Sequence, residues 1–359
     1  MLSVAQISED RNIFGVDTHK DTHVAVGIDK TGRRLGESIA PASTEGYAAV
    51  EKWALDFGEI EAFGIEGTGS YGAGLCRYLQ ARGHRVIEVN RPDRTLRRQK
   101  GKSDSLDAES AARAVLSGTA TAIPKGTDDA VEMIRLLEVA RRGAMKAKTA
   151  AATTLQSMLV SLPAELREQL ANPSTVKIVR ICARFRASDV STPLTAAKMT
   201  LRSIAKRYEQ LELEISALDK TLAKLVPQAA PVLIGLFGVG PGVGATLLVA
   251  AGENPERLTS EASFASLCGV SPVPASSGKT NRHRLNRGGN RQANCALHTV
   301  VLSRLSHDAA TKAYMVKRLA EGKSKREVIR CLKRYVAREV YQALIGDGAH
   351  RSSQRQVAA

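Results

Sequence analysis

The sequence predicts an α/β fold at its amino-terminal end, followed by a long helical segment and a mainly helical carboxy-terminal part. Three observations support this prediction. Residues 12–90 alternate short β-branched runs with stretches whose apolar residues recur at helical spacing. Residues 127–161 and 196–226 are long, amphipathic and rich in Ala, Leu, Lys and Glu. Residues 229–345 have a helical pattern interrupted by one basic loop at 272–291.

The amino-terminal part is expected to form a mixed sheet with helices on its faces. The runs NIFGVDTH, HVAVGIDK and GRRLGESIA are separated by short polar turns, so they predict three strands in a meander. A helix over residues 45–57, a strand at IEAFGIEG, a helix at YGAGLCRYLQARG and a strand at HRVIEVN follow. A meander joined to two strand–helix–strand units makes a single mixed sheet.

A chain of 359 residues is long enough for two or three domains. We expect a catalytic domain over residues 1–122, a helical coiled-coil linker over 123–228 and a further domain over 229–346. The polar tail, residues 347–359, is expected to be disordered. Residues 163–192 show no pattern that predicts a fold.

The net charge of +16 and the isoelectric point near 9.8 indicate a polyanionic partner, nucleic acid first and a membrane surface second. Aromatic residues make up 4% of the chain, so contacts to backbone phosphates are expected to outweigh base stacking. The basic residues cluster before residue 103 and in the loop at 272–291. The candidate nucleic-acid-binding residues are Arg94, Arg97, Arg98, Lys100, Lys102, Lys279, Arg282, Arg284, Arg287 and Arg291.

Cysteine usage and hydropathy favour a cytoplasmic protein. The five cysteines form no CxxC pair and are odd in number, which argues against a zinc site and a disulfide framework. The amino terminus lacks the apolar run of a signal peptide. Residues 225–252 carry no charge, but the GVGPGVG at their centre would break a spanning helix, so we expect a helical hairpin and no membrane span. This segment resembles a helix-hairpin-helix that offers backbone N–H groups to phosphate; a buried hairpin is the alternative.

Four acidic residues stand where the predicted layout would bring them together. Asp17 lies near the end of the first strand and Glu66 ends the fourth, while Asp104 and Asp107 open a helix. Reactive groups gather at the carboxyl ends of strands in open α/β sheets, and carboxylates three residues apart share one side of a helix. Such a cluster favours a divalent cation, Mg²⁺ first and Mn²⁺ second. The alternative is structural: Asp104 as a helix N-cap, Asp107 in the first turn, and strand-end positions for Asp17 and Glu66.

The loop VSPVPASSGKTNRHRLNRGGNRQ places Ser276 and Ser277 before a glycine and a series of cationic residues. Cations near a hydroxyl can hold a phosphate in line for attack and stabilise the charge that develops. A flexible surface loop that binds phosphate without chemistry is the alternative.

Three acidic motifs, GVDTHKDTHVAV, GIEGTGSYGAGL and KSDSLDAESAA, resemble in order and spacing those of the DEDD transposases of insertion sequences. The carboxy-terminal LIGLFGVGPGVGATLLVAA, FASLCGVSPVPASSGKT and RLNRGGNRQANCAL resemble the second domain of that family. The resemblance covers most of the chain and fails between about 163 and 192. His19 and the paired glycines Gly288 and Gly289 depart from the family pattern.

The resemblance implies a RuvC-like catalytic domain of the ribonuclease-H type, with Asp17, Glu66, Asp104 and Asp107 holding the metal. It also implies that Ser277 is the nucleophile, because it stands immediately before the glycine of the loop, with Ser276 as the alternative. A phosphoserine–DNA intermediate, a dimer or tetramer with a composite site, and a bridge RNA that selects donor and target DNA are further implications.

Other functions remain open at this point. A site-specific invertase or junction resolvase shares the acidic domain, although a resolvase would not need the serine loop. An actin-like kinase or ATPase also carries an aspartate near its first turn, but His19 and Lys20 fit its phosphate-binding turn poorly. A nonenzymatic nucleic-acid-binding protein would use all four acids as caps and turn residues.

Overall fold

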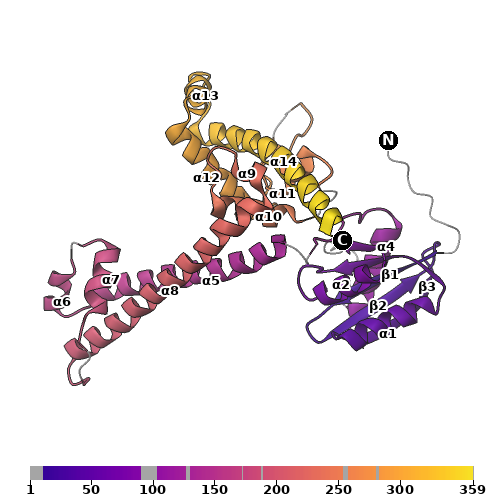
Figure 1. The fold of residues 1–359 in the computed structure, drawn as a ribbon, viewed down its shortest axis with the longest axis horizontal. Helices are drawn as coiled ribbons and strands as arrows, with labels where there is room; N and C mark the ends of the chain where they lie inside the picture. Colours follow the sequence, from indigo (N-terminus) through magenta and orange to yellow (C-terminus); the bar gives the residue numbers. More distant parts are fainter. Residues whose placement is uncertain are drawn as a thin grey trace. The chain divides into compact units, whose positions relative to one another are not determined.

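The computed structural model describes residues 11–89, 103–126, 130–171, 173–186, 189–253, 258–279 and 283–358. The chain divides into two compact units, residues 1–127 and 128–359, and Figure 1 labels most of their elements. The helical segment and the carboxy-terminal part, which we expected as separate domains, both belong to the second unit.

The first unit is built on one sheet of five strands in the order β3-β2-β1-β4-β5. The strands β1 (Arg11–Thr18), β2 (Thr22–Ile28) and β3 (Arg34–Pro41) form the predicted antiparallel meander. The strands β4 (Glu59–Glu66) and β5 (Val86–Val89) continue the sheet in parallel with β1. The mixed sheet confirms the predicted RuvC-like fold class.

Helices cover both faces of this sheet, because apolar residues of β1 and β4 point to both sides. Phe14 and Phe63 pack in one cluster under α1 (Thr44–Leu55) and α2 (Ala73–Ala81). Ile13 lies in a second cluster under α4 (Asp104–Leu116). The strands are therefore buried on both sides, as is typical of a sheet between helical layers.

The second unit begins with a helical hairpin of α5 (Ala130–Leu159) and α8 (Pro193–Ala229), which pack along one another. Two short helices, α6 (Ala164–Gln169) and α7 (Thr175–Ala183), lie in the segment whose fold the sequence did not predict. Leu166 and Ile178 of these helices join Leu155 and Leu201 of the hairpin in one apolar cluster. The short helices therefore bury their apolar residues in a cluster that they share with the hairpin.

The rest of the second unit is mainly helical. Its elements are α9 (Pro231–Ile234), α10 (Pro241–Ala251), α11 (Glu261–Leu267), β6 (Val273–Pro274), β7 (His283–Arg284), α12 (Arg291–His307), α13 (Ala309–Ala320) and α14 (Lys325–Ala358). The uncharged segment 225–252 forms the end of α8, α9 and α10. Across the part of the chain that the structure describes, no helix combines the length and apolarity that crossing a bilayer requires.

The expected disorder after Gly346 is wrong, because α14 continues through this residue to Ala358. Asp347 is fully buried and accepts hydrogen bonds from the backbone N–H groups of Val232 and Leu233, at 2.8 and 3.0 Å. Arg351 is buried as well and donates to the carbonyl oxygen of Ala229 at 2.8 Å. Both polar side chains satisfy the ends of other helices, and this role does not show in the composition of the tail.

Candidate active site and serine loop

The acidic residues of β1 and β4 share one face of the sheet. Side chains alternate along a strand, so Asp17 follows Ile13 and Gly15 on the side of α4, opposite Phe14. In the parallel pairing Val16 lies opposite Ile65, which places Asp17 and the next residue of β4, Glu66, at the same level. Asp17 and Glu66 therefore meet at the carboxyl ends of neighbouring strands, as the sequence predicts.

Two glycines allow α4 to approach this face closely. A Cβ atom on Gly15 would lie 1.9 Å from the carbonyl oxygen of Ala108, and one on Gly64 would lie 2.7 Å from the side chain of Val115. On the helix side, Ala108 and Ala112 are small and fully buried. Close packing of small residues thus sets the start of α4 beside the end of β1.

The start of α4 carries two acids that are not needed as caps. Ser103 is the N-cap, and its hydroxyl accepts from the backbone N–H of Leu106 at 3.2 Å. The structural alternative that made Asp104 the cap is therefore wrong. Asp107 lies in the first turn as well and is 3% exposed. Asp104 and Asp107 both lie close enough to Asp17 to raise the pKa of its carboxyl group.

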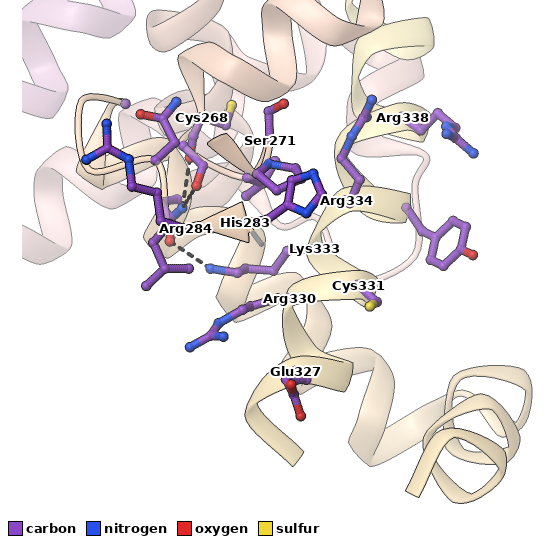
Figure 2. A pocket seen from close by; sticks show the side chains of 18 of the residues that line it. Cys268, Ser271, His283, Arg284, Glu327, Arg330, Cys331, Lys333, Arg334 and Arg338 are labelled. Atoms are coloured by element: carbon purple, nitrogen blue, oxygen red, sulfur yellow. Dashed lines mark hydrogen bonds between the residues drawn. The ribbon is translucent and has the colours of Figure 1, made fainter. Parts of the chain in front are cut away.

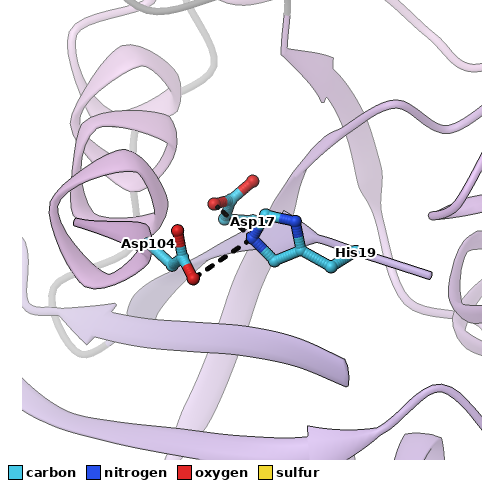
Figure 3. A group of neighbouring side chains, drawn as sticks. All are labelled: Asp17, His19 and Asp104. Carbon is cyan, nitrogen blue, oxygen red and sulfur yellow. Dashed lines mark ion pairs between the residues drawn. The ribbon is translucent and has the colours of Figure 1, made fainter. Parts of the chain in front are cut away.

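His19 lies between two of the predicted acids, as Figure 3 shows. Its Nε2 atom lies 3.2 Å from Oδ2 of Asp17 and 3.3 Å from Oδ2 of Asp104. One ligand atom from each of these three residues lies within 4.8 Å of the others. His19 was not among the residues predicted for the site, although its position two residues after Asp17 was a usable signal.

The electrostatics of Asp17 fit a cation site. Burial raises the pKa of Asp17; the His19 imidazole lowers it, and the nearby Asp107 and Asp104 carboxylates raise it further. A divalent cation would relieve this repulsion, and the oxygen and nitrogen donors of Asp17, His19 and Asp104 suit Mn²⁺ as well as Mg²⁺. Glu66 and Asp107 face the same place but lie outside this group of three among the described residues.

Ser276 and Ser277 lie in the second unit on the part of the basic loop that joins β6 to β7, residues 275–282, which is called the serine loop from here on. Ser276 and Ser277 are exposed, as is Lys279, and Gly278 has a φ of 54°, a backbone conformation that favours glycine. Arg284, Arg287 and Arg291 follow the loop and line one wall of a cavity (Figure 2). The remaining predicted nucleic-acid-binding residues, Arg94, Arg97, Arg98, Lys100, Lys102 and Arg282, lie outside the described residues.

The stretch after the serine loop is held to the helical core by close backbone contacts. A Cβ atom on Gly289 would lie 2.3 Å from the backbone nitrogen of Gly269, so one of the paired glycines has a packing role. Asn290 caps α12 through hydrogen bonds from the N–H groups of Gln292 and Ala293. Asn294 donates to the carbonyl oxygen of Cys268 at 2.8 Å. These contacts fix the position of the backbone that carries Arg284, Arg287 and Arg291.

Comparison with known families finds two matches along the chain. A family model of DEDD type, described as "Transposase", matches residues 14–162. A second model, described as "Transposase IS116/IS110/IS902 family", matches residues 230–316. The RuvC-like sheet and these two matches in chain order assign the chain to the DEDD class of transposase families. The chain belongs to the IS110 family of these transposases.

The chain is also similar to the "Insertion element IS110 uncharacterized 43.6 kDa protein" of Streptomyces coelicolor. The two are 29% identical over 161 residues, which is 45% of this chain and 38% of that protein. The chain therefore matches less than half of the length of this relative. The relative's name places it in an insertion element and states no activity.

Proposed function

We propose that the chain is a metal-dependent DNA transposase that cuts and joins phosphodiesters through the acidic site and Ser277. The observation that carries this proposal is the convergence of Asp17 and Asp104, distant in sequence, on one place above the sheet, with Asp107 close enough to raise the pKa of Asp17. Membership of a transposase family makes DNA the expected substrate.

Asp17, Asp104, Asp107 and Glu66 would hold the cation, with His19 beside them. The bound cation would neutralise charge on the phosphate and lower the pKa of an attacking or leaving oxygen. The serine step is a transesterification: the bond from Oγ of Ser277 to phosphorus forms, a phosphorus–oxygen bond to deoxyribose breaks, and the serine proton ends on the released sugar oxygen. The phosphoserine bond conserves the energy of the original phosphodiester. The hydroxyl group of another DNA strand can therefore attack the phosphoserine, form a new phosphodiester and release the serine.

The composite nature of the site is part of the proposal. The acids belong to the first unit and Ser277 belongs to the second, so an active assembly has to bring one to the other, within one chain or between copies in a homodimer or tetramer. The resemblance also implies an element-encoded guide RNA, which we propose as the source of target choice. The cationic residues that precede Asp104 in the sequence and those that follow Ser277 would then bind the phosphates of the nucleic acid.

The test uses the chain with its coding DNA and native flanks on a supercoiled plasmid, with Mn²⁺ or Mg²⁺. We expect a covalent protein–DNA adduct that survives denaturing electrophoresis in the wild type and is lost in Ser277→Ala. Ser276→Ala is the matched control and should keep the adduct, whereas Asp17→Asn should lose it. An adduct that persists in Ser277→Ala, or that disappears only in Ser276→Ala, would overturn the assignment of the nucleophile.

A further inference from the structure

A cavity of about 1270 Å³ opens within the second unit beside the stretch that follows the serine loop. Figure 2 shows its two walls: one is β7 and the residues after it, and the other is the first half of α14. The turn after α11 (residues 268–272), the end of α13 and the turn to α14 also line it. Among the lining residues, only Arg284, Arg287 and Arg291 of the first wall were predicted from the sequence to bind nucleic acid.

The lining is strongly cationic. It contains ten lysine and arginine side chains, and Glu327 is the one carboxylate among its described residues. Glu327 accepts hydrogen bonds from the backbone and the hydroxyl of Ser324 at 2.8 and 2.7 Å, so it caps the start of α14. The cations that α13, α14 and the turn between them add are Lys317, Arg318, Lys323, Arg330, Lys333, Arg334 and Arg338.

Some of these cations already have acidic partners and some do not. Arg334 and Arg338 both pair with Glu261. Arg284, Arg287, Arg330 and Lys333, in contrast, form no ion pair with any described residue. The two walls therefore bring together several positive charges that the fold itself leaves uncompensated.

Lys333 is held in position in the cavity by a hydrogen bond to the opposite wall. It is half-buried, and its Nζ atom donates to Oδ1 of Asn294 at 2.8 Å, so a residue of the opposite wall holds it in place. Burial lowers the pKa of Lys333, and the neighbouring Arg330 lowers it further. A half-buried ammonium with cationic neighbours is costly unless an anion binds there.

The aromatic residues of the cavity argue for contacts to phosphates. Tyr314 and Tyr335 pack edge to face at 5.6 Å, and Arg318 and Arg338 lie over their rings at 5.9 and 5.8 Å. Both rings are therefore engaged by protein groups, which disfavours them as platforms for stacked bases. Lysine and arginine side chains bind the phosphates of a nucleic acid backbone, whereas stacking on bases needs free aromatic faces and reading of base edges often uses a row of amide side chains. Among the described residues, the lining offers the cations and neither of the other two features.

We propose that this cavity binds the phosphodiester backbone of a nucleic acid strand, held between Arg284 and Arg287 on one wall and Arg330 and Lys333 on the other. Because the first wall continues directly from the loop of Ser277, the strand it holds is the one that flanks the attacked phosphate. This last step rests on the proposed function, whereas phosphate binding by the cavity does not.

The experiment measures binding without chemistry. The full chain with Ser277→Ala, in EDTA, is titrated against fluorescein-labelled 20-nucleotide single-stranded DNA, the corresponding duplex, and RNA of the same sequence, over a series of salt concentrations. The test variant adds Arg330→Gln and Lys333→Gln. The matched control adds Lys325→Gln and Arg326→Gln, which remove the same charge from the same helix at exposed positions that do not line the cavity.

We expect the test variant to bind at least one of the three probes about tenfold or more weakly, because the loss of even one hydrogen bond to a charged group lowers affinity about tenfold. The slope of log affinity against log salt should shrink by about 1.4 for single strands or 1.8 for duplex. The probe that is affected identifies the strand as DNA or RNA, single or double. The control should lose less than about twofold.

Equal losses in the test variant and the control, with both chains folded by circular dichroism, would overturn the cavity as a binding site. The result is independent of catalysis, since every chain in the comparison lacks Ser277 and metal. If the cavity variants lose binding while wild-type protein forms no adduct on plasmid DNA, the proposed chemistry fails and phosphate binding by the cavity stands.

Discussion

Gly15 of β1 and Ala108 of α4 are packed so closely that a Cβ atom on Gly15 would lie 1.9 Å from the carbonyl oxygen of Ala108. This contact sets the distance between the helix and the sheet. The acids at the start of α4 and Asp17 at the end of β1 depend on that distance, because each lies within a few residues of the contact. The acidic site is therefore a product of tight helix–sheet packing as well as of acidic side chains.

Gly15→Ala should destabilise the first unit and disrupt the site together. The added methyl group would clash with the backbone of α4, which cannot shift without moving the whole helix. We therefore expect the free energy of unfolding to fall by about 3 kcal/mol, near the upper end of overpacking effects. Chemical denaturation followed by circular dichroism measures the loss. Gly69→Ala is the control, since a Cβ atom there has nothing within 4 Å. A stable Gly15→Ala protein that keeps its response to metal would contradict the proposed role of the contact.

Divalent cations should stabilise the wild type through Asp17. At a cation concentration about 100 times the dissociation constant, binding to the folded state adds roughly 2.7 kcal/mol to the free energy of unfolding, which raises the melting temperature. We expect Mn²⁺ to produce this shift and Asp17→Asn to abolish it, because the buried carboxylate that needs neutralising is gone. Asp56→Asn, an exposed position, should respond as the wild type does. Equal shifts in all three proteins would place the cation elsewhere.

The buried carboxylate of Glu51 makes the stability of the first unit depend on pH. Burial raises the pKa of Glu51, but hydrogen bonds from His84, Arg82 and Tyr78 outweigh it, so the pKa lies below the ordinary value of 4.5. A lowered pKa in the folded state stabilises the fold above the unfolded pKa, and this stabilisation is lost as the pH falls through the folded pKa.

Glu51→Gln should therefore cost about 1 to 3 kcal/mol at pH 7, and the difference from the wild type should shrink as the pH falls below 4.5. Denaturation curves at several pH values test this expectation. Glu59→Gln removes a carboxylate from a surface pair with Arg11 and should cost much less. A difference that stays constant from pH 7 to pH 3 would show that ionisation of Glu51 is not involved.

Asp347 should be essential for the end of the second unit. Asp347→Ala leaves the N–H groups of Val232 and Leu233 without their acceptor, and we expect a loss of about 3 kcal/mol. Asp347→Asn keeps one acceptor oxygen and should lose about half as much. Hydrogen exchange at the amides of Val232 and Leu233 is the direct measurement. Unchanged protection of both amides in Asp347→Ala would contradict the capping role.

Much of the first unit could be predicted, because its strands and helices have strong local patterns. The meander, the two strand–helix–strand units and the positions of Asp17 and Glu66 at strand ends all follow from periodicity. Local patterns could not show that Ser103 would cap α4 in place of Asp104, since both residue types are good caps. Nor could they show that the imidazole of His19 turns toward the acids.

The sequence by itself determined the class of the fold, the basic character of the surface and the order of the acidic and serine motifs, because these depend on composition and on periodicity over short distances. Only the tertiary structure decided which charges meet. In the folded chain, His19 lies between Asp17 and Asp104. Lys333 of α14 donates a hydrogen bond to Asn294 of α12, and the buried Asp347 accepts one from the backbone of α9. The physical reason is that packing of small side chains and the need to satisfy buried polar groups act between residues far apart in the chain, where no local pattern records them.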